Sequence, residues 1–213
     1  MTTNSINHME TLNKDIQQKM TPQDALQRLL DGNKRFTADQ NASRDLLQQV
    51  EETSGGQFPF AAVLGCIDSR VPVEVVFDQG VGDIFSARVA GNIVNEDILG
   101  SLEYACKVAG SKLILVLGHT KCGAVTAACK NVELGNITAL LSKIKPAVDI
   151  VIKEDAEVND SSIEQVSLQN IKQSIANLHN QSPILKEMVE KGEILIKGAV
   201  YDVASGKVSL VGE

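Results

Sequence analysis

Two short motifs bring together side chains that bind metals. The first, CIDSR from Cys66, follows the apolar run 60–64, and the second, HTKCG from His119, follows the apolar run 113–117. Sites in open α/β sheets form beyond the carboxyl ends of the strands, so Cys66, His119 and Cys122 would converge if the two runs are neighbouring strands. Two thiolates and one imidazole suit Zn²⁺ and leave a fourth position open, which is typical of catalytic zinc sites.

Asp68 and Arg70 lie close behind the first of these ligands. Arginine can hold a carboxylate through two hydrogen bonds and keep it ionised. An aspartate fixed in this way can orient a zinc-bound hydroxide toward a substrate, or it can swing onto the metal and block it, and the spacing allows both. The competing interpretation is a structural ion pair beside buried thiols and a core histidine. A single His-x-x-Cys motif is weak evidence, but two motifs at two strand ends are far more specific.

The elements that must position these residues can be read from the apolar pattern. The runs 60–64, 84–90 and 113–117 lack alternation, which is typical of strands buried on both faces. A helix capped near Asn95 and ended by Gly110 separates the last two runs and predicts parallel pairing. The remaining expected elements are a helix from Thr21 to about Gly32, a polar loop over 37–57, helices starting near Cys122 and over 136–152, 161–178 and 183–191, a loop over 153–160, and a strand pair at 194–201 and 207–211.

The sequence therefore predicts an α/β fold with a central, mostly parallel β-sheet flanked by helices. An N-terminal helical arm and a C-terminal strand pair complete it. We expect residues 1–36 to form the arm, which would contact a second subunit, and residues 37–213 to form a single zinc-binding catalytic domain.

Composition excludes several classes of partner. The chain has 213 residues and a net charge of -7, which argues against nucleic acid and against an anionic membrane surface. It contains no run of about 18 apolar residues and no apolar leader, so we expect a cytoplasmic protein. Four cysteines do not make a disulfide framework, and we expect Cys106 and Cys129 to be core thiols.

The two motifs resemble both signature motifs of the β-carbonic anhydrases. The resemblance extends from LDGNKRF at 30–36 through RVAGN at 88–92 to GAVYD at 198–202, and so covers nearly the whole chain beyond about residue 20. It implies a zinc lyase with one Zn²⁺ per chain. The implied reaction is reversible hydration of carbon dioxide to bicarbonate and a proton, by zinc-bound hydroxide that Asp68 and Arg70 orient.

The resemblance also implies a substrate pocket. Its residues would be Gln57, which hydrogen-bonds bicarbonate in the family, together with Phe85, Ala90, Tyr104 and Gly123. In the family these groups and the zinc ligands come from two subunits, so a homodimer or homotetramer is implied. Gln57 could instead be an ordinary loop residue, and the two aromatic residues could serve packing alone.

Val63 stands where one subgroup of the family, which has an allosteric bicarbonate site, carries tryptophan. Arg88 and Tyr201 match that subgroup, but Val63 does not. We therefore expect the form without the allosteric site, with Asp68 paired to Arg70. Two alternatives remain: hydrolysis of a CO₂-like molecule such as CS₂ or COS on the same site, and a non-catalytic zinc-binding protein.

Overall fold

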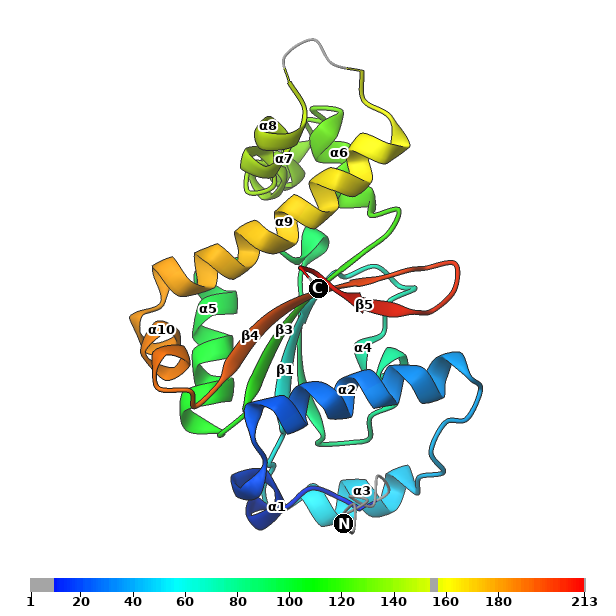
Figure 1. Ribbon diagram of the computed structural model, residues 1–213, viewed down its shortest axis with the longest axis vertical. Helices are drawn as coiled ribbons and strands as arrows, with labels where there is room; N and C mark the ends of the chain where they lie inside the picture. Colours follow the sequence, from blue (N-terminus) through cyan, green and yellow to red (C-terminus); the bar gives the residue numbers. More distant parts are fainter. Residues whose placement is uncertain (1–9, 154–156, 213) are drawn as a thin grey trace.

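The computed structural model describes residues 10–153 and 157–212, so the first nine residues of the predicted arm lie outside it. The described residues form one five-stranded sheet in the order β2-β1-β3-β4-β5. Its first four strands are parallel, and β5 is antiparallel to β4 (Figure 1). This confirms the predicted α/β class and the C-terminal strand pair. The strands are β1 (Ala61–Gly65), β2 (Ile84–Arg88), β3 (Leu113–His119), β4 (Leu195–Tyr201) and β5 (Val208–Leu210).

Side-chain caps explain where the longer helices begin. Thr21 and Asp24 form a capping box at the start of α2, and Asn159 does the same with Ser162 for α9. Asn95 caps α5. The helices are α1 (Lys14–Lys19), α2 (Pro22–Thr37), α3 (Leu46–Thr53), α4 (Val73–Val76), α5 (Glu96–Glu103), α6 (Gly123–Cys129), α7 (Gly135–Leu141), α8 (Lys145–Val151), α9 (Asp160–Gln181) and α10 (Pro183–Glu190).

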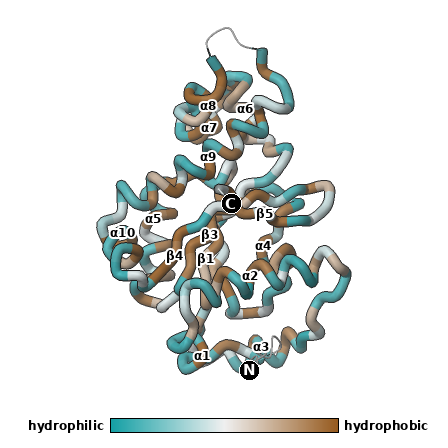
Figure 2. The backbone as a smooth tube through the Cα atoms, in the orientation of Figure 1, coloured by the Kyte–Doolittle hydropathy of each residue, from teal (hydrophilic) through white to brown (hydrophobic). Residues whose placement is uncertain are grey.

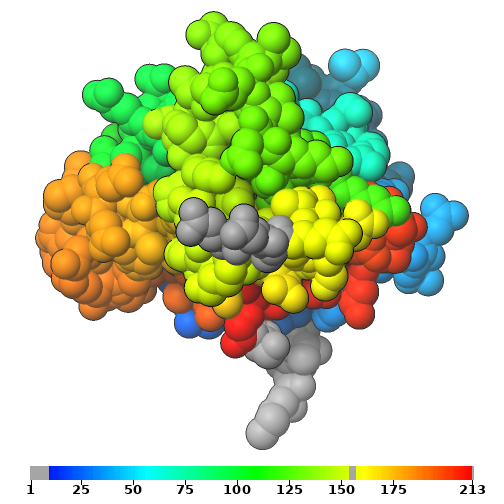
Figure 3. Space-filling model, turned by 90° about the horizontal axis from the view of Figure 1, so that it is seen from above, coloured from blue at the N-terminus to red at the C-terminus, as the bar shows by residue number. Residues whose placement is uncertain are grey.

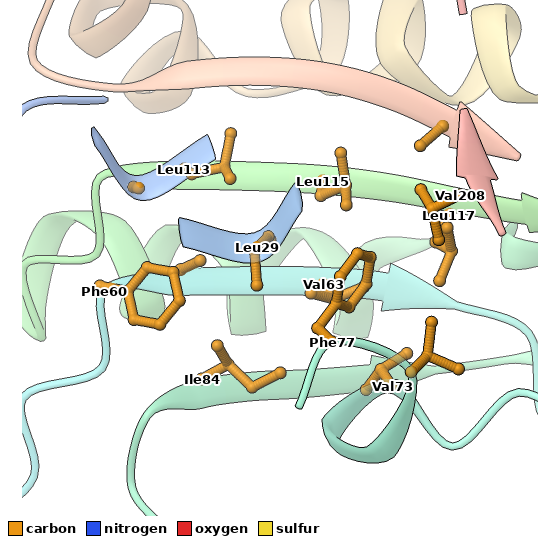
Figure 4. Packing of buried hydrophobic residues seen from close by; sticks show 14 of the residues in the cluster. Leu29, Phe60, Val63, Val73, Phe77, Ile84, Leu113, Leu115, Leu117 and Val208 are labelled. Carbon is orange, nitrogen blue, oxygen red and sulfur yellow. The ribbon is translucent and has the colours of Figure 1, made fainter. Parts of the chain in front are cut away.

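The sheet is covered on both faces, and its central strands are the most apolar part of the chain (Figure 2). Alternate residues of β1 and β3 point to opposite sides. Val63 and Leu115 pack with Leu29 of α2 and Phe77 in one core, part of which Figure 4 shows. The other face packs against α5, α9 and α10, as Leu64 illustrates. Burial on both faces is the physical reason for the missing alternation in these strands.

A third apolar cluster lies beyond the carboxyl ends of the strands. It joins α6, α7 and α8 to the first turns of α9, and it includes Cys66 and Cys122. These three helices form a lobe that lies beyond the ends of the strands in Figure 1 and faces the viewer in Figure 3. The lobe therefore covers the edge of the sheet at which the two motifs end.

Three local predictions need correction. The predicted loop over 37–57 contains α3, whose residue Gln49 is buried and accepts a hydrogen bond from the Val81 backbone at 3.0 Å. This tertiary contact stabilises a helix that is too short to be predicted from its own apolar pattern. The helix predicted over 136–152 is two helices, because Pro146 lacks the backbone N–H that would continue the first. The helix after Asn95 ends in a π-helical turn, Tyr104–Val108.

Among the described helices, none is both long and apolar enough to cross a membrane.

Candidate metal centre

Neighbouring strands bring the three predicted ligands together. β1 and β3 pair in parallel, with Gly65 opposite Leu117, so the residues that follow both strands leave the sheet side by side. The ligand atoms of Cys66, His119 and Cys122 all lie within 4.8 Å of one another, and all three residues are buried. The convergence expected from the two motifs is confirmed.

The imidazole of His119 is oriented so that Nε2 can bind a metal. Its Nδ1 lies 2.9 Å from the carbonyl oxygen of Thr120, which places the ring proton on Nδ1. Its Nε2 is buried and has no hydrogen-bond partner among the described residues. A buried polar atom without a partner is costly. A metal ion at this position would remove that cost, so the residues fit the group that the donor set suggests.

Thr120 is held in turn by the end of β4. Its backbone N–H donates to the Tyr201 carbonyl at 3.0 Å, and its hydroxyl donates to Asp202 at 3.3 Å. These bonds fix the carbonyl that orients His119. Sequence reasoning assigned no role to Thr120, although the matched segment GAVYD, which includes Asp202, gave a signal.

The two thiols receive backbone hydrogen bonds. The N–H of Gly91 donates to Cys66 Sγ at 3.3 Å. In the metal-free protein, a hydrogen bond from Cys122 lowers the pKa of Cys66 well below its usual range, and His119 and Gly91 add to this effect. The same pairing and burial raise the pKa of Cys122. The pocket thus stabilises negative charge on the sulfur of Cys66, which metal binding requires.

Asp68 is paired with Arg70 as predicted. Arg70 donates from its backbone N–H and from Nε to one carboxylate oxygen, each at 2.9 Å, and from Nη2 to the other at 2.8 Å. Hydrogen bonds from the Arg70 side chain hold the pKa of Asp68 far below its usual range, although burial opposes them. Asp68 Oδ2 lies 3.8 Å from His119 Nε2. An ionised carboxylate therefore stands beside the metal position.

Arg88 holds the loop that carries Cys66 and Asp68. Its Nε donates to the Cys66 carbonyl at 2.9 Å and its Nη2 to the Asp68 carbonyl at 2.6 Å. In the sequence, this residue is marked by its matches to the family segment RVAGN and to the allosteric subgroup, neither of which assigns it this role. Two charge-assisted bonds to neighbouring carbonyls fix the loop backbone.

The predicted pocket residues fall into two groups. Ala90 precedes Gly91 in the turn that contacts Cys66, and Gly123 directly follows Cys122 as the first residue of α6. Gln57 is exposed in the loop before β1. Phe85 and Tyr104 stack edge to face at 6.3 Å and line a surface cavity of about 740 Å³ whose lining does not include the three ligands. One described chain therefore does not gather the whole predicted pocket.

Comparisons with known proteins agree with this geometry. The family model described as carbonic anhydrase matches residues 61–208. Carbonic anhydrase 2 of Mycobacterium tuberculosis is 33% identical over 197 residues, covering 89% of this chain and 92% of the relative. A carbonic anhydrase of Mycolicibacterium smegmatis is 34% identical over 196 residues, covering 89% and 93%. The solved β-carbonic anhydrase CcaA is 26% identical, with a TM-score of 0.72 over 87% of this chain and 86% of that one. With its motifs, its parallel sheet and its buried Cys-His-Cys group, the chain belongs to the β-carbonic anhydrase family.

Proposed function

We propose that the chain catalyses the zinc-dependent, reversible hydration of carbon dioxide to bicarbonate and a proton. The observation that carries the proposal is the buried Cys66, His119 and Cys122 group with an ionised Asp68 beside it. Two thiolates and an imidazole select zinc over harder cations. Three protein ligands, rather than four, leave a coordination position for water. One Zn²⁺ per chain follows from the single group found in the described residues.

Each residue near the metal has a defined task in this reaction. A bound Zn²⁺ lowers the pKa of a water molecule toward about 7 and so supplies a nucleophile near neutral pH. Asp68, kept ionised by Arg70, accepts a hydrogen bond from the attacking hydroxyl group and turns its lone pair toward carbon dioxide. Gly123 leaves room beside Cys122, since nothing lies within 4 Å of the Cβ position there. Ala90 adds a small apolar wall.

The rest of the pocket comes from a second subunit. Gln57, Phe85 and Tyr104 would reach the partner's metal centre, where the Gln57 amide donates to bicarbonate and the two rings exclude water. The position of β2 at the edge of the sheet supports a homodimer or homotetramer. So do the exposed apolar side chains of Leu46, Val75 and Val81, which line a cavity next to that strand. We also propose a reducing, cytoplasmic setting, which the four free thiols support.

One sample of purified protein can test the proposal against its alternatives. Zinc content, CO₂ hydration between pH 6 and 9, and turnover of CS₂ and COS are measured together. We expect one zinc per chain and CO₂ hydration that rises with pH. Turnover of CS₂ or COS without CO₂ hydration would assign the site to hydrolysis of those molecules. Zinc-loaded, folded protein that is inactive on all three would instead indicate a non-catalytic zinc protein.

A further inference from the structure

The long helix α9 carries polar side chains on a buried face. Ser167, Asn170 and Ser174 are 4%, 2% and 2% exposed. Their spacing of three and four residues places them on one side of the helix, beside the core residues Val166 and Ile171. Buried polar groups destabilise a fold unless they are hydrogen-bonded. Their partners therefore reveal what this face of α9 holds.

Two of these side chains donate hydrogen bonds to consecutive residues of one turn. Asn170 Nδ2 donates to the Gly91 carbonyl at 2.8 Å, and Ser174 Oγ donates to the Asn92 carbonyl at 3.0 Å. Both turn residues have left-handed backbones, with φ of 71° at Gly91 and 42° at Asn92. A non-glycine residue in this region costs on the order of 1 kcal/mol or more, so the turn needs support from outside.

This turn contacts a metal ligand. The peptide unit between Gly91 and Asn92 is held at both ends, because the Asn92 N–H donates to the Val89 carbonyl at 2.9 Å while the Gly91 carbonyl accepts from Asn170. The neighbouring N–H, that of Gly91, then faces Cys66 Sγ at 3.3 Å. Glycine suits this position, because a side chain would be strained at this φ and its Cβ would come within 2.6 Å of Ile144 Cδ1.

We infer that Asn170 is a positioning residue for the Cys66 thiolate. By holding the Gly91 carbonyl, it aims the Gly91 N–H at Sγ and so orients the sulfur toward the metal. Hydrogen bonds behind a metal ligand fix its direction and tune its donor strength. The inference rests on the proposed zinc site, but not on the reaction carried out there.

The test compares Asn170→Ala with Ser174→Ala. Each variant loses one buried hydrogen bond from the same face of α9. Only Asn170, however, holds the carbonyl of Gly91, the residue whose N–H donates to Cys66. The zinc dissociation constant is measured by competition with a chromophoric chelator, and the sulfur-to-metal charge-transfer band is recorded with Co²⁺. We expect Asn170→Ala to weaken zinc binding about 10- to 100-fold and to shift the band. Ser174→Ala should change neither, although urea unfolding should show that both variants lose stability.

A second variant covers the case in which Asn170→Ala does not fold. Asn170→Leu keeps about the size of the side chain and removes its hydrogen-bonding groups without adding a charge, so it should reproduce the loss of zinc affinity. Unchanged zinc affinity and an unchanged cobalt spectrum in the folded variant would overturn the inference, as would an equal loss of affinity in Ser174→Ala. Because these readouts do not involve CO₂, wild-type protein that binds zinc but lacks hydration would contradict the proposed reaction alone.

Discussion

At the scale of single residues, the orientation of Asp68 decides how the site can work. Arg70 contacts both of its carboxylate oxygens, and Arg70 Nη2 also reaches the Lys121 carbonyl at 3.2 Å, next to Cys122. The arginine thus ties the loop after β1 to the loop after β3. A carboxylate held in this way cannot move onto the metal without giving up its bonds to Arg70. This geometry favours the open state expected from the sequence.

Replacing Asp68 by Asn should separate metal binding from activity. The three ligands remain, so zinc content should stay at one per chain, whereas CO₂ hydration should fall on the order of 10²- to 10³-fold because the amide no longer presents two acceptor oxygens. Stopped-flow hydration assays and zinc analysis of the same sample provide the measurement. Wild-type rates in this variant would remove Asp68 from the mechanism.

Replacing Cys66 should reduce the zinc content, whereas replacing Cys106 should not. Cys66→Ala removes a ligand and should lower zinc stoichiometry well below one per chain. Cys106→Ala is the matched control, because Cys106 is equally buried but outside the ligand group, and burial raises the pKa of its thiol to about 12. Zinc analysis after dialysis against a weak chelator distinguishes the two. Full zinc content in Cys66→Ala would show that the assigned ligand set is wrong.

At the scale of elements, a buried ionic cluster joins α2 to the segment after α4. Asp78 accepts hydrogen bonds from Arg35 at the end of α2 and from Arg44 in the loop before α3. Burial alone would raise the pKa of Asp78, but these two arginines outweigh it and hold the pKa below its usual range. The carboxylate therefore contributes stability above its unfolded pKa of about 3.9, and loses that contribution as the pH falls through its folded pKa.

Asp78→Asn should consequently destabilise the protein in a pH-dependent way. Asparagine tolerates the left-handed backbone at this position, where φ is 46°, so the charge is the main change. We expect a loss of about 3–5 kcal/mol in the free energy of unfolding at pH 7. The difference from wild type should begin to shrink as the pH falls below about 3.9, and it should keep shrinking as the pH passes through the lowered pKa of Asp78. Urea unfolding at several pH values measures both, and a constant difference across that range would contradict the ionic explanation.

Elements with strong local signals were predictable from sequence, whereas those set by distant contacts were not. The buried strands and the capped helix after Asn95 follow from apolar runs and a capping residue, and the ligands follow from strand ends. By contrast, α3 depends on the contact between Gln49 and Val81. The support of Gly91 by Asn170 joins residues far apart in the chain. The only sequence signal for this contact is the presence of polar residues such as Asn170 among the apolar residues of α9.

At the scale of the whole molecule, the described chain carries two separate parts of the proposed site. The metal ligands lie under the lobe of α6, α7 and α8, while Phe85 and Tyr104 line a cavity on the edge strand β2 and the adjoining α5. Under the proposed function, a complete pocket requires two copies of the chain. Assembly and activity should therefore be lost together.

Val75→Lys should test this dependence. Val75 is 53% exposed in the described chain and lines the cavity beside β2, so a charge there should not affect folding but would be desolvated in an interface. We expect the dimer dissociation constant to rise at least about tenfold, with CO₂ hydration falling at low protein concentration and zinc retained. Ile150→Lys, at an equally exposed position of α8 (57%), is the control. Sedimentation analysis and activity against concentration provide the measurement, and an active monomer would contradict the two-subunit pocket.

If the chain binds zinc as proposed, the pairing of β1 with β3 makes metal supply part of the folding equilibrium. Cys66 follows β1, whereas His119 ends β3 and Cys122 follows it, so the proposed zinc would be a cross-link that exists only when these strands are in register. Above the zinc dissociation constant, each tenfold increase in the free zinc concentration should add about 1.4 kcal/mol to the free energy of unfolding. Calorimetry with buffered zinc should show a melting temperature that climbs with free zinc in wild-type protein and stays flat in Cys66→Ala. A zinc-starved cell would then hold a larger unfolded fraction of this chain, which proteases can degrade, so zinc supply would set the amount of protein as well as its activity.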